Sequence, residues 1–176
     1  MGRAVPEQRF TDSHAPARAL RIRQLGDTDP VLATVARWLH EEWGHLQPDA
    51  SPALTRERLA ERCGRGVVPS LYLASVGDCP LGTVSLVGLD MPLRPLLSPW
   101  LASLWVLPAW RCRGVGARLL AHAENRAAAV GLSPLYLFTE DRQPWYARRG
   151  WQPWERLLYR GLRVTVMRKY PGDSLD

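Results

Sequence analysis

Lysine, cysteine and long apolar segments are all scarce in this sequence of 176 residues. Lys169 is the single lysine among 23 basic residues. The three cysteines, Cys63, Cys79 and Cys112, are odd in number and lack C-x-x-C spacing, which excludes a disulfide framework and a zinc site of common spacing. Residues 1–18 hold no apolar core of a secretory signal, and the longest apolar stretch, residues 95–110, is short and broken by prolines. We therefore expect a cytoplasmic protein that neither crosses nor binds a membrane.

The chain is basic because of its arginines. Its formal net charge is +6 and its pI is ≈ 9.8. Two explanations are open: arginine's planar fork suits phosphate and carboxylate partners, and a GC-rich genome raises arginine content whatever the function. Hydrophobic residues make up 46% of the chain, enough to close one sizeable core. We expect a flexible N-terminal arm over residues 1–18 and a single domain over residues 19–176.

The hydrophobic pattern alternates strands with helices. Strands are predicted over residues 19–25, 71–76, 81–89, 100–107, 135–139, 151–160 and 162–170. Helices are predicted from Pro30 to Gly44, from Pro52 to Gly64, from Gly114 to Val130, and briefly between Asp141 and Gly150. A four-residue turn, residues 77–80, would join the second and third strands. The strand at 100–107 is apolar on both faces, which favours a central place. The pattern indicates an α/β (α+β) fold with one mixed sheet covered by helices.

The most informative segment runs from Val106 to Ala117. A buried strand ends there, a tight turn carries Gly114 and Gly116, and a helix begins at once. Backbone N–H groups of such a turn, together with the helix N-terminus, form a phosphate site. Arg111, Arg113 and Arg118 add positive charge around it.

Two common phosphate motifs do not fit this segment. Leu119 stands where a dinucleotide-binding G-x-G-x-x-G loop needs its third glycine, and the segment has no lysine for a P-loop. The alternative is that Gly114 and Gly116 bind no ligand and only shape a turn between strand and helix.

Two motifs together resemble the GNAT superfamily of acetyl-CoA-dependent N-acetyltransferases. Arg111-x-x-Gly114-x-Gly116, after a strand ending in Val-x-Pro, resembles the Q/R-x-x-G-x-G/A loop of that family. Residues 145–151, Trp-Tyr-Ala-Arg-Arg-Gly-Trp, resemble its F-Y-x-x-x-G-F pattern, with tryptophan replacing both phenylalanines. The order of elements from Leu20 to Tyr170 also matches. The resemblance implies a single, mostly antiparallel mixed sheet of about seven strands flanked by about four helices.

The resemblance also implies residue roles. The backbone of Leu104, Trp105 and Val106 would pair with the pantetheine arm of acetyl-CoA. The pyrophosphate would lie on a loop made of Arg111, Cys112, Arg113, Gly114, Val115, Gly116 and Ala117.

Tyr146 would be the general acid for the departing thiolate, and the Val106 amide would be the oxyanion donor. The alternative for Tyr146 is a core tyrosine with its hydroxyl at the surface. Arg148 and Arg149 would either approach the phosphates or cap a helix C-terminus. No metal is implied.

The resemblance does not assign a general base, because residues 101–105 lack the glutamate that many family members carry on this strand. Asp90, Glu140 and Asp141 are candidate bases acting through water, although a turn or cap role is the more common one for a residue at each of these positions. Cys112 needs no nucleophilic role in a turn that binds through its backbone.

The acceptor site is expected at the first two helices and the loop before the central strand. That region offers aromatic and acidic side chains, which suit a cationic amine, although some of them also fit a helix's buried and solvated faces. They are Trp38, Trp43, Trp100, Trp105, Glu41, Glu42 and Asp49.

The sequence thus predicts acetyl transfer to a primary amine of a small molecule or peptide, by direct attack in a ternary complex. We expect a monomer or homodimer with no nucleic-acid partner. The alternatives are a catalytically silent acyl-CoA sensor or interaction domain and a basic nucleic-acid-binding module.

Overall fold

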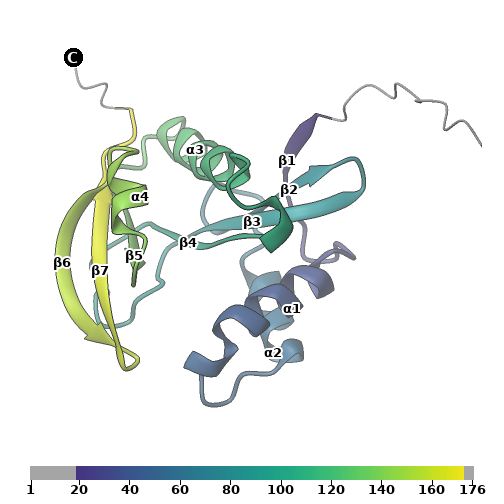
Figure 1. Cartoon of the computed structure of the whole chain (residues 1–176), viewed down its shortest axis with the longest axis horizontal. Helices are drawn as coiled ribbons and strands as arrows, with labels where there is room; N and C mark the ends of the chain where they lie inside the picture. Colours follow the sequence, from purple (N-terminus) through teal and green to yellow (C-terminus); the bar gives the residue numbers. More distant parts are fainter. Residues whose placement is uncertain (1–18, 173–176) are drawn as a thin grey trace, which may run out of the picture.

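The computed structural model describes residues 19–172, which form one seven-stranded sheet with helices on both faces (Figure 1). The predicted arm at residues 1–18 lies outside this range. The strands are β1 Leu20–Gln24, β2 Ser70–Val76, β3 Cys79–Val87, β4 Trp100–Val106, β5 Leu135–Thr139, β6 Gln152–Tyr159 and β7 Leu162–Lys169. The α-helices are α1 Leu32–Trp43, α2 Pro52–Glu61, α3 Val115–Ala128 and α4 Gln143–Ala147. This confirms the predicted class, and no described helix is long and apolar enough to cross a membrane.

The sheet has the order β1-β2-β3-β4-β5-β7-β6, so β4 is central as its two apolar faces predicted. All neighbours pair antiparallel except β4 and β5, which are parallel. These two strands share one register position, Trp100 opposite Tyr136, at the start of both. Beyond it they separate, and Figure 1 shows β5, β7 and β6 turned away from β1 to β4. The second half of β4 therefore has a neighbour on only one side.

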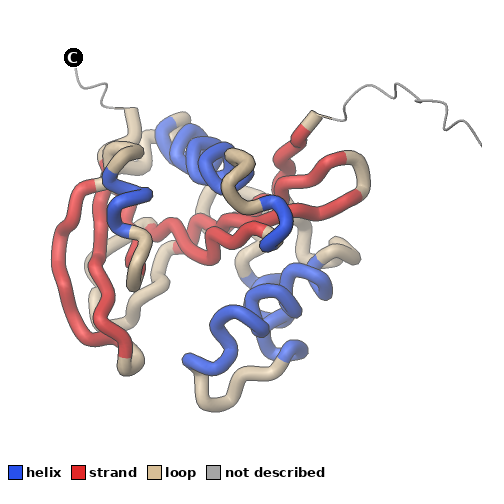
Figure 2. The backbone as a smooth tube through the Cα atoms, viewed as in Figure 1, coloured by secondary structure: helices blue, strands red, loops and turns tan. Residues whose placement is uncertain are grey.

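The two faces of the sheet carry different helices (Figure 2). One face is covered by α3, whose Leu119, Leu120, Ala123 and Ala127 join the core that also contains Tyr72 and Leu137. The opposite face is covered by α1 and α2, where Val35, Leu39 and Leu59 pack on Leu71 and Leu73. Apolar residues at helical spacing on each helix produce these contacts.

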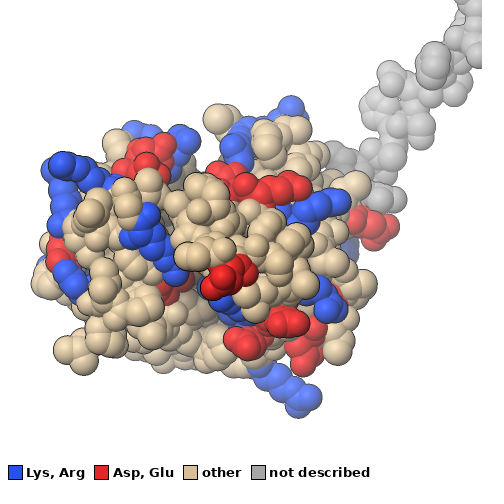
Figure 3. Space-filling model, turned by 90° about the horizontal axis from the view of Figure 1, so that it is seen from below, with Lys and Arg blue, Asp and Glu red and all other residues tan. Residues whose placement is uncertain are grey.

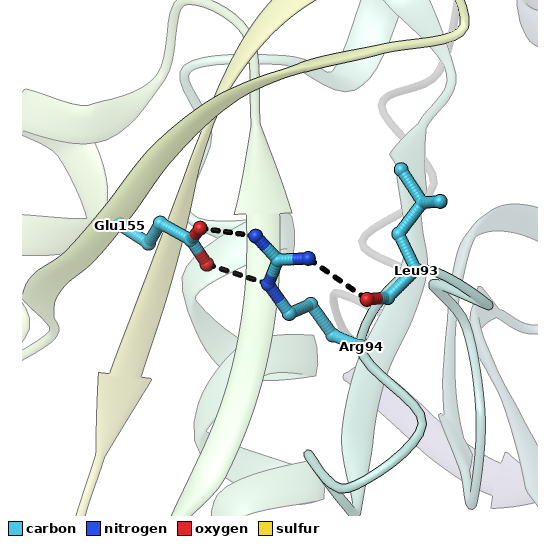
Figure 4. Close-up of polar contacts among 3 residues, drawn as sticks. All are labelled: Leu93, Arg94 and Glu155. Atoms are coloured by element: carbon cyan, nitrogen blue, oxygen red, sulfur yellow. Dashed lines mark hydrogen bonds and ion pairs between the residues drawn. The ribbon is translucent and has the colours of Figure 1, made fainter.

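A third apolar cluster lies where β4 meets β5 and β7. Trp100 is completely buried there, against Met91, Tyr159 and Val166. The loop that precedes β4 is fixed to the sheet edge, since Arg94 donates twice to the Glu155 carboxylate on β6 and once to its neighbour's carbonyl, Leu93 O (Figure 4). The expected place of Trp100 in the acceptor site is therefore wrong, because its side chain is in this core.

Local signals set most element ends, with two corrections. The Ser51 hydroxyl accepts from Leu54 N at 3.1 Å and caps α2 as predicted. However, α2 ends at Glu61 and does not reach Gly64, because Arg62 N and Cys63 N turn back to the carbonyls three residues earlier. The turn between β2 and β3 is also shorter than predicted. Val76 pairs with Cys79, so only Gly77 and Asp78 form it, and Gly77 has φ 56°.

Candidate functional site

The centre of the candidate site is a bulge in β4. Thr83 lies opposite Trp105 and Ser85 lies opposite Ala102, so two β4 residues, Ser103 and Leu104, oppose one β3 residue. Ser103 has φ 53°, a left-handed conformation that is unusual for serine. The bulge bends β4 just where β5 leaves it.

Past the bulge, the backbone groups of Val106 face away from β3. Leu107 N donates to Leu81 O at 2.8 Å, and a Cβ added to Gly82 would lie 2.5 Å from Trp105 O. Leu107 and Trp105 thus point their polar groups toward β3. Because these groups alternate along a strand, those of Val106 point to the side that β5 has left open. Of the three positions predicted to pair with a ligand, Val106 therefore faces the open side of β4, whereas Trp105 is turned to β3.

The loop after β4 is a concave turn of backbone N–H groups. Cys112 has φ 59° and Gly114 has φ 81°, and Gly114 precedes the first residue of α3. The first helical hydrogen bond that reaches back to the loop runs from Arg118 N to Gly114 O at 3.0 Å. The N–H groups of Val115, Gly116 and Ala117 therefore start the helix without intrahelical acceptors. This geometry, with the positive end of the helix dipole, suits an anion.

The arginine side chains around this loop are used mainly in contacts with the protein. Arg111 Nε donates to Val106 O at 2.9 Å, and Arg111 Nη2 lies 3.6 Å from Glu42 Oε2. The Arg113 guanidinium lies over the Trp110 ring, 5.4 Å from its centroid, and Arg118 donates to Leu20 O at 3.2 Å. Part of the positive charge expected around the loop is thus engaged in contacts that hold the loop against β4, α1 and β1.

The second motif packs against the first. A Cβ at Gly116 would lie 3.7 Å from Trp145 Cζ2, so α4 lies directly beside the start of α3. Arg149 stacks on Trp145 at 3.9 Å and donates to Trp145 O at 2.8 Å, which favours the capping role for this residue. Arg148 is exposed. The two segments that carried the resemblance therefore form one continuous region.

Tyr146 is held within an aromatic cluster. Its ring meets Trp145 edge to face at 4.9 Å and Trp151 at 6.1 Å. Burial raises the pKa of Tyr146 to about 12, while the nearby Arg142 opposes that rise. The hydroxyl therefore keeps its proton at neutral pH and can donate it.

The three candidate bases lie in two different places. Asp90, just after β3, is largely buried, and Arg62 Nη2 lies 3.8 Å from its Oδ1. Burial raises the pKa of Asp90, with Arg62 and Arg160 opposing the rise. Glu140 and Asp141 follow β5 and are exposed, and Asp141 lies 3.3 Å from Arg142. Of the three carboxylates, Asp90 is connected to the β4 bulge, because Arg62 also donates to Ser103 Oγ at 2.8 Å.

A small pocket opens between α1, α2 and the bulge. Trp105 stacks on Trp38 at 4.7 Å beside it and donates through Nε1 to Glu42 Oε2 at 3.0 Å. The pocket is lined by apolar, polar and basic side chains: Leu39, Trp43, Gly44, Gln47, Ala50, Thr55, Arg58, Leu59, Arg62 and Ser103. Sequence reasoning missed Arg58, Arg62 and Ser103. Arg58 in α2 and Arg62 at its C-cap are four positions apart and lie on one side, and that spacing could have pointed to them.

Charge elsewhere on the surface is mixed. Figure 3 shows acidic and basic side chains interspersed on the face seen from below, without a continuous basic surface there. Among residues 19–172, no three His, Cys, Asp or Glu side chains lie close enough together to hold a metal ion.

Comparisons with known proteins agree with this geometry. The family model described as "Acetyltransferase (GNAT) family" matches residues 32–151. An amino-acid acetyltransferase of Pseudomonas syringae pv. syringae is 39% identical over 62 residues, which is 35% of this chain and 14% of that protein. One from Ralstonia nicotianae is 44% identical over 50 residues, 28% of this chain and 11% of that protein. The matched segment thus spans a small part of these curated relatives.

Solved structures share the fold. An aminoglycoside 6'-N-acetyltransferase complexed with coenzyme A has a TM-score of 0.71 and 17% identity, covering 89% of this chain and 99% of that one. An N-acetylglutamate synthase from Neisseria gonorrhoeae, complexed with coenzyme A and N-acetyl-glutamate, has a TM-score of 0.62 and 24% identity, covering 87% of this chain and 35% of that one.

Proposed function

This chain belongs to the GNAT acetyltransferase family, and we propose that it transfers an acetyl group from acetyl-CoA to a primary amine of a small molecule or peptide in a ternary complex. The observation that carries the proposal is the combination of an open β4 edge with a turn of free N–H groups at its end. A thioester cofactor with a pyrophosphate fits both parts. The coenzyme A named for one solved relative adds support.

The residues present fit acetyl-CoA. The N–H groups of Val115, Gly116 and Ala117 have no intrahelical acceptors and are available to a phosphate. The backbone from Arg111 to Ala117 would hold the pyrophosphate, and that of Leu104 and Val106 would hold the pantetheine amides, since the polar groups of Trp105 are turned to β3. Bound there, acetyl-CoA supplies an activated acyl group. The Val106 carbonyl already accepts from Arg111 Nε at 2.9 Å, so a ligand N–H would either share this oxygen or displace the guanidinium.

The chain's own groups then serve the reaction. The Val106 amide N–H faces the open side of β4 and is the proposed donor to the negative charge that develops on the carbonyl oxygen. Tyr146, protonated at neutral pH, is the proposed donor to the departing sulfur. The amine must lose a proton, and we propose Asp90 as the acceptor through water, because its burial favours the protonated carboxyl and Arg62 links it to the bulge.

Thiol release from acetyl-CoA across a panel of amines tests this function. We expect turnover above the amine-free rate with at least one amine, and failure with every amine would overturn it. Asp90→Asn, Glu140→Gln and Asp141→Asn would be compared in the same assay. We expect Asp90→Asn to lower kcat by about 100-fold or more and to flatten the rise of rate with pH. An equal loss of kcat in Glu140→Gln or Asp141→Asn would instead assign the general base to the carboxylates that follow β5.

A catalytically silent CoA-binding domain is the second candidate, favoured by the absence of any carboxylate in β4 from Leu101 to Trp105. It predicts that coenzyme A raises the melting temperature while no amine is acetylated. A short DNA duplex in the same melting experiment tests the nucleic-acid alternative. Stabilisation by the duplex and not by coenzyme A would overturn both CoA-based candidates.

A further inference from the structure

The pocket beside the β4 bulge is lined by two arginines and no carboxylate. Its volume is about 80 Å³, smaller than sites for drug-sized ligands, which measure about 300–1,000 Å³. Leu39 and Trp43 form an apolar wall, and Ser103 brings the bulge of β4 to its edge. The charged groups that a small ligand would contact in this pocket are therefore the guanidinium groups of Arg58 and Arg62.

Arg62 and Arg58 are held in different ways. Arg62 donates to Ser103 Oγ at 2.8 Å and keeps Asp90 at 3.8 Å, so its charge is partly balanced. Arg58 donates to the neutral amide oxygen of Gln47. Within residues 19–172 no carboxylate lies within 4.0 Å of the Arg58 guanidinium. Arg58 therefore keeps a full charge and free donors at the pocket.

A second, wider hollow continues from the first. It shares Gln47 and Arg58 with the pocket and adds Arg160 and His45, against one acidic residue, Asp49. Basic groups thus outnumber acidic ones along the whole path. Of the three acidic residues expected to attract a cationic amine, Asp49 lines this hollow, whereas Glu42 contacts Trp105 and Arg111, and Glu41 is exposed and lines neither hollow.

From this arrangement we infer that the acceptor is a small amine carrying a carboxylate close to its amino group, as in a free amino acid, with Arg58 and Arg62 holding the carboxylate. The inference rests on the proposed function, since it assumes that the acetyl group lies at the bulge. Arg62 touches Ser103 of the bulge, so a carboxylate bound by these guanidinium groups would place the neighbouring amino group beside the bulge, where the acetyl group is assumed to lie. Charge-assisted, two-pronged hydrogen bonds are what guanidinium offers a carboxylate.

The test compares the free L-amino acids with their α-amides as acceptors for acetyl-CoA, using the full chain and thiol release. We expect the best free acid to exceed its amide by about tenfold or more in kcat/KM. The comparison is stringent, because the amide's amine is less basic and a larger fraction of it is neutral, and so able to attack, at a given pH. Arg58→Gln should raise KM for the acid about tenfold and leave the amide unchanged. Arg56→Gln, on the exposed side of the same helix, is the matched control and should change neither.

A binding measurement separates this inference from the proposed function. Each N-acetyl amino acid and its amide would be added to the protein with coenzyme A, and the melting temperature recorded. If no amine is acetylated but the acids still stabilise wild type and not Arg58→Gln, the proposed function fails and the carboxylate site stands. Turnover only with amines that lack a carboxylate, or equal turnover of acids and amides, overturns the inference and leaves the proposed function standing. No stabilisation by any acid, without turnover, overturns both. Arg62→Gln tests the second arginine in the same two assays. If that variant fails to fold, Arg62→Lys, which keeps a charge near Ser103, takes its place.

Discussion

The indole of Trp105 on the central strand donates to the Glu42 carboxylate of α1 at 3.0 Å, and the same carboxylate lies 3.6 Å from Arg111 in the loop after that strand. One side chain thus ties the helix of the acceptor side to the strand and to the turn of the proposed cofactor site.

Replacing Glu42 should show which of its two contacts stabilises the fold. Glu42→Ala leaves the buried indole N–H of Trp105 without its acceptor and should cost about 1–2 kcal/mol in the free energy of unfolding. Glu42→Gln keeps an acceptor oxygen and loses only the exposed pair with Arg111, so it should cost about 0.5 kcal/mol or less. Urea unfolding measures both, with Glu41→Ala as the exposed control. Equal costs for the two Glu42 variants would contradict the assignment.

Tyr146→Phe should remove the proposed proton donor without disturbing the aromatic cluster. We expect kcat to fall by about 100-fold or more while the Kd of coenzyme A stays unchanged, because the ring contacts with Trp145 and Trp151 remain. Steady-state kinetics and calorimetry give the two values. Tyr170→Phe, an exposed tyrosine, is the control. An unchanged kcat would leave Tyr146 as a packing residue.

The two glycines of the loop should respond differently to alanine. Gly114 has φ 81°, so Gly114→Ala introduces about 1–2 kcal/mol of strain and should weaken coenzyme A binding by about tenfold. At Gly116 the added Cβ meets Val106 and Trp145 at 3.6 and 3.7 Å, which is ordinary contact, so Gly116→Ala should bind nearly as well as wild type. Calorimetric titration with coenzyme A checks the pair, and the opposite order would refute the proposed loop geometry.

Lys169, the only lysine, should matter for stability. Its Nζ lies 2.6 Å from Glu124 Oε2 and 2.7 Å from Arg149 O, and Glu124 also accepts from Trp151. Lys169→Met leaves a mostly buried carboxylate without its cation. We expect a loss of about 2 kcal/mol, less than the ~3–5 kcal/mol of a fully buried pair, since the lysine keeps some exposure. Thermal or urea unfolding measures it. Adding Glu124→Gln to Lys169→Met should recover part of the loss, and no recovery would contradict the charge explanation.

Cys63 should be the slow thiol of the three. Burial, followed by the negative charges of Asp27 and Asp29, raises the pKa of Cys63 to about 11. Only the thiolate reacts, so below that pKa its rate with a disulfide reagent should rise about tenfold per pH unit between pH 8 and 10. The exposed Cys79 and Cys112 should react first. Since the folded pKa lies above the ordinary thiol value, rising pH should also favour unfolding as it passes from about 9 toward 11. Cys63→Ser should lack the slow phase, and three equally fast thiols would contradict the burial.

Much of the fold was predictable because its signals are local. The alternation of Leu20, Ile22 and Gln24 with Arg21 and Arg23 appears in the alternating exposure of β1, and β5 has the predicted bounds. Errors arose where a particular hydrogen bond or strand pairing decided the end of an element. The tighter turn at Gly77 and the early end of α2 are examples.

The candidate site was predictable only in part. The turn at Gly114 and the motif around Tyr146 are short patterns, and each was visible in the sequence. Their packing through Gly116 and Trp145 was not, and neither was the pocket formed by Arg58, Arg62 and Ser103, because these residues come from separate elements. The placement of Trp100 failed for the same reason, since an aromatic residue near a site and one in a core look alike in sequence.

The sequence by itself determined the elements, the glycine turn and the family, since backbone preferences and hydrophobic period act over a few residues. Only the tertiary structure decided which way charged side chains face. Arg111 and Glu42 neutralise each other at the end of β4, whereas Arg58 meets no carboxylate in the described part of the chain. Such pairing depends on distances between side chains far apart in sequence, and the proposed preference for an acceptor with a carboxylate rests on those distances.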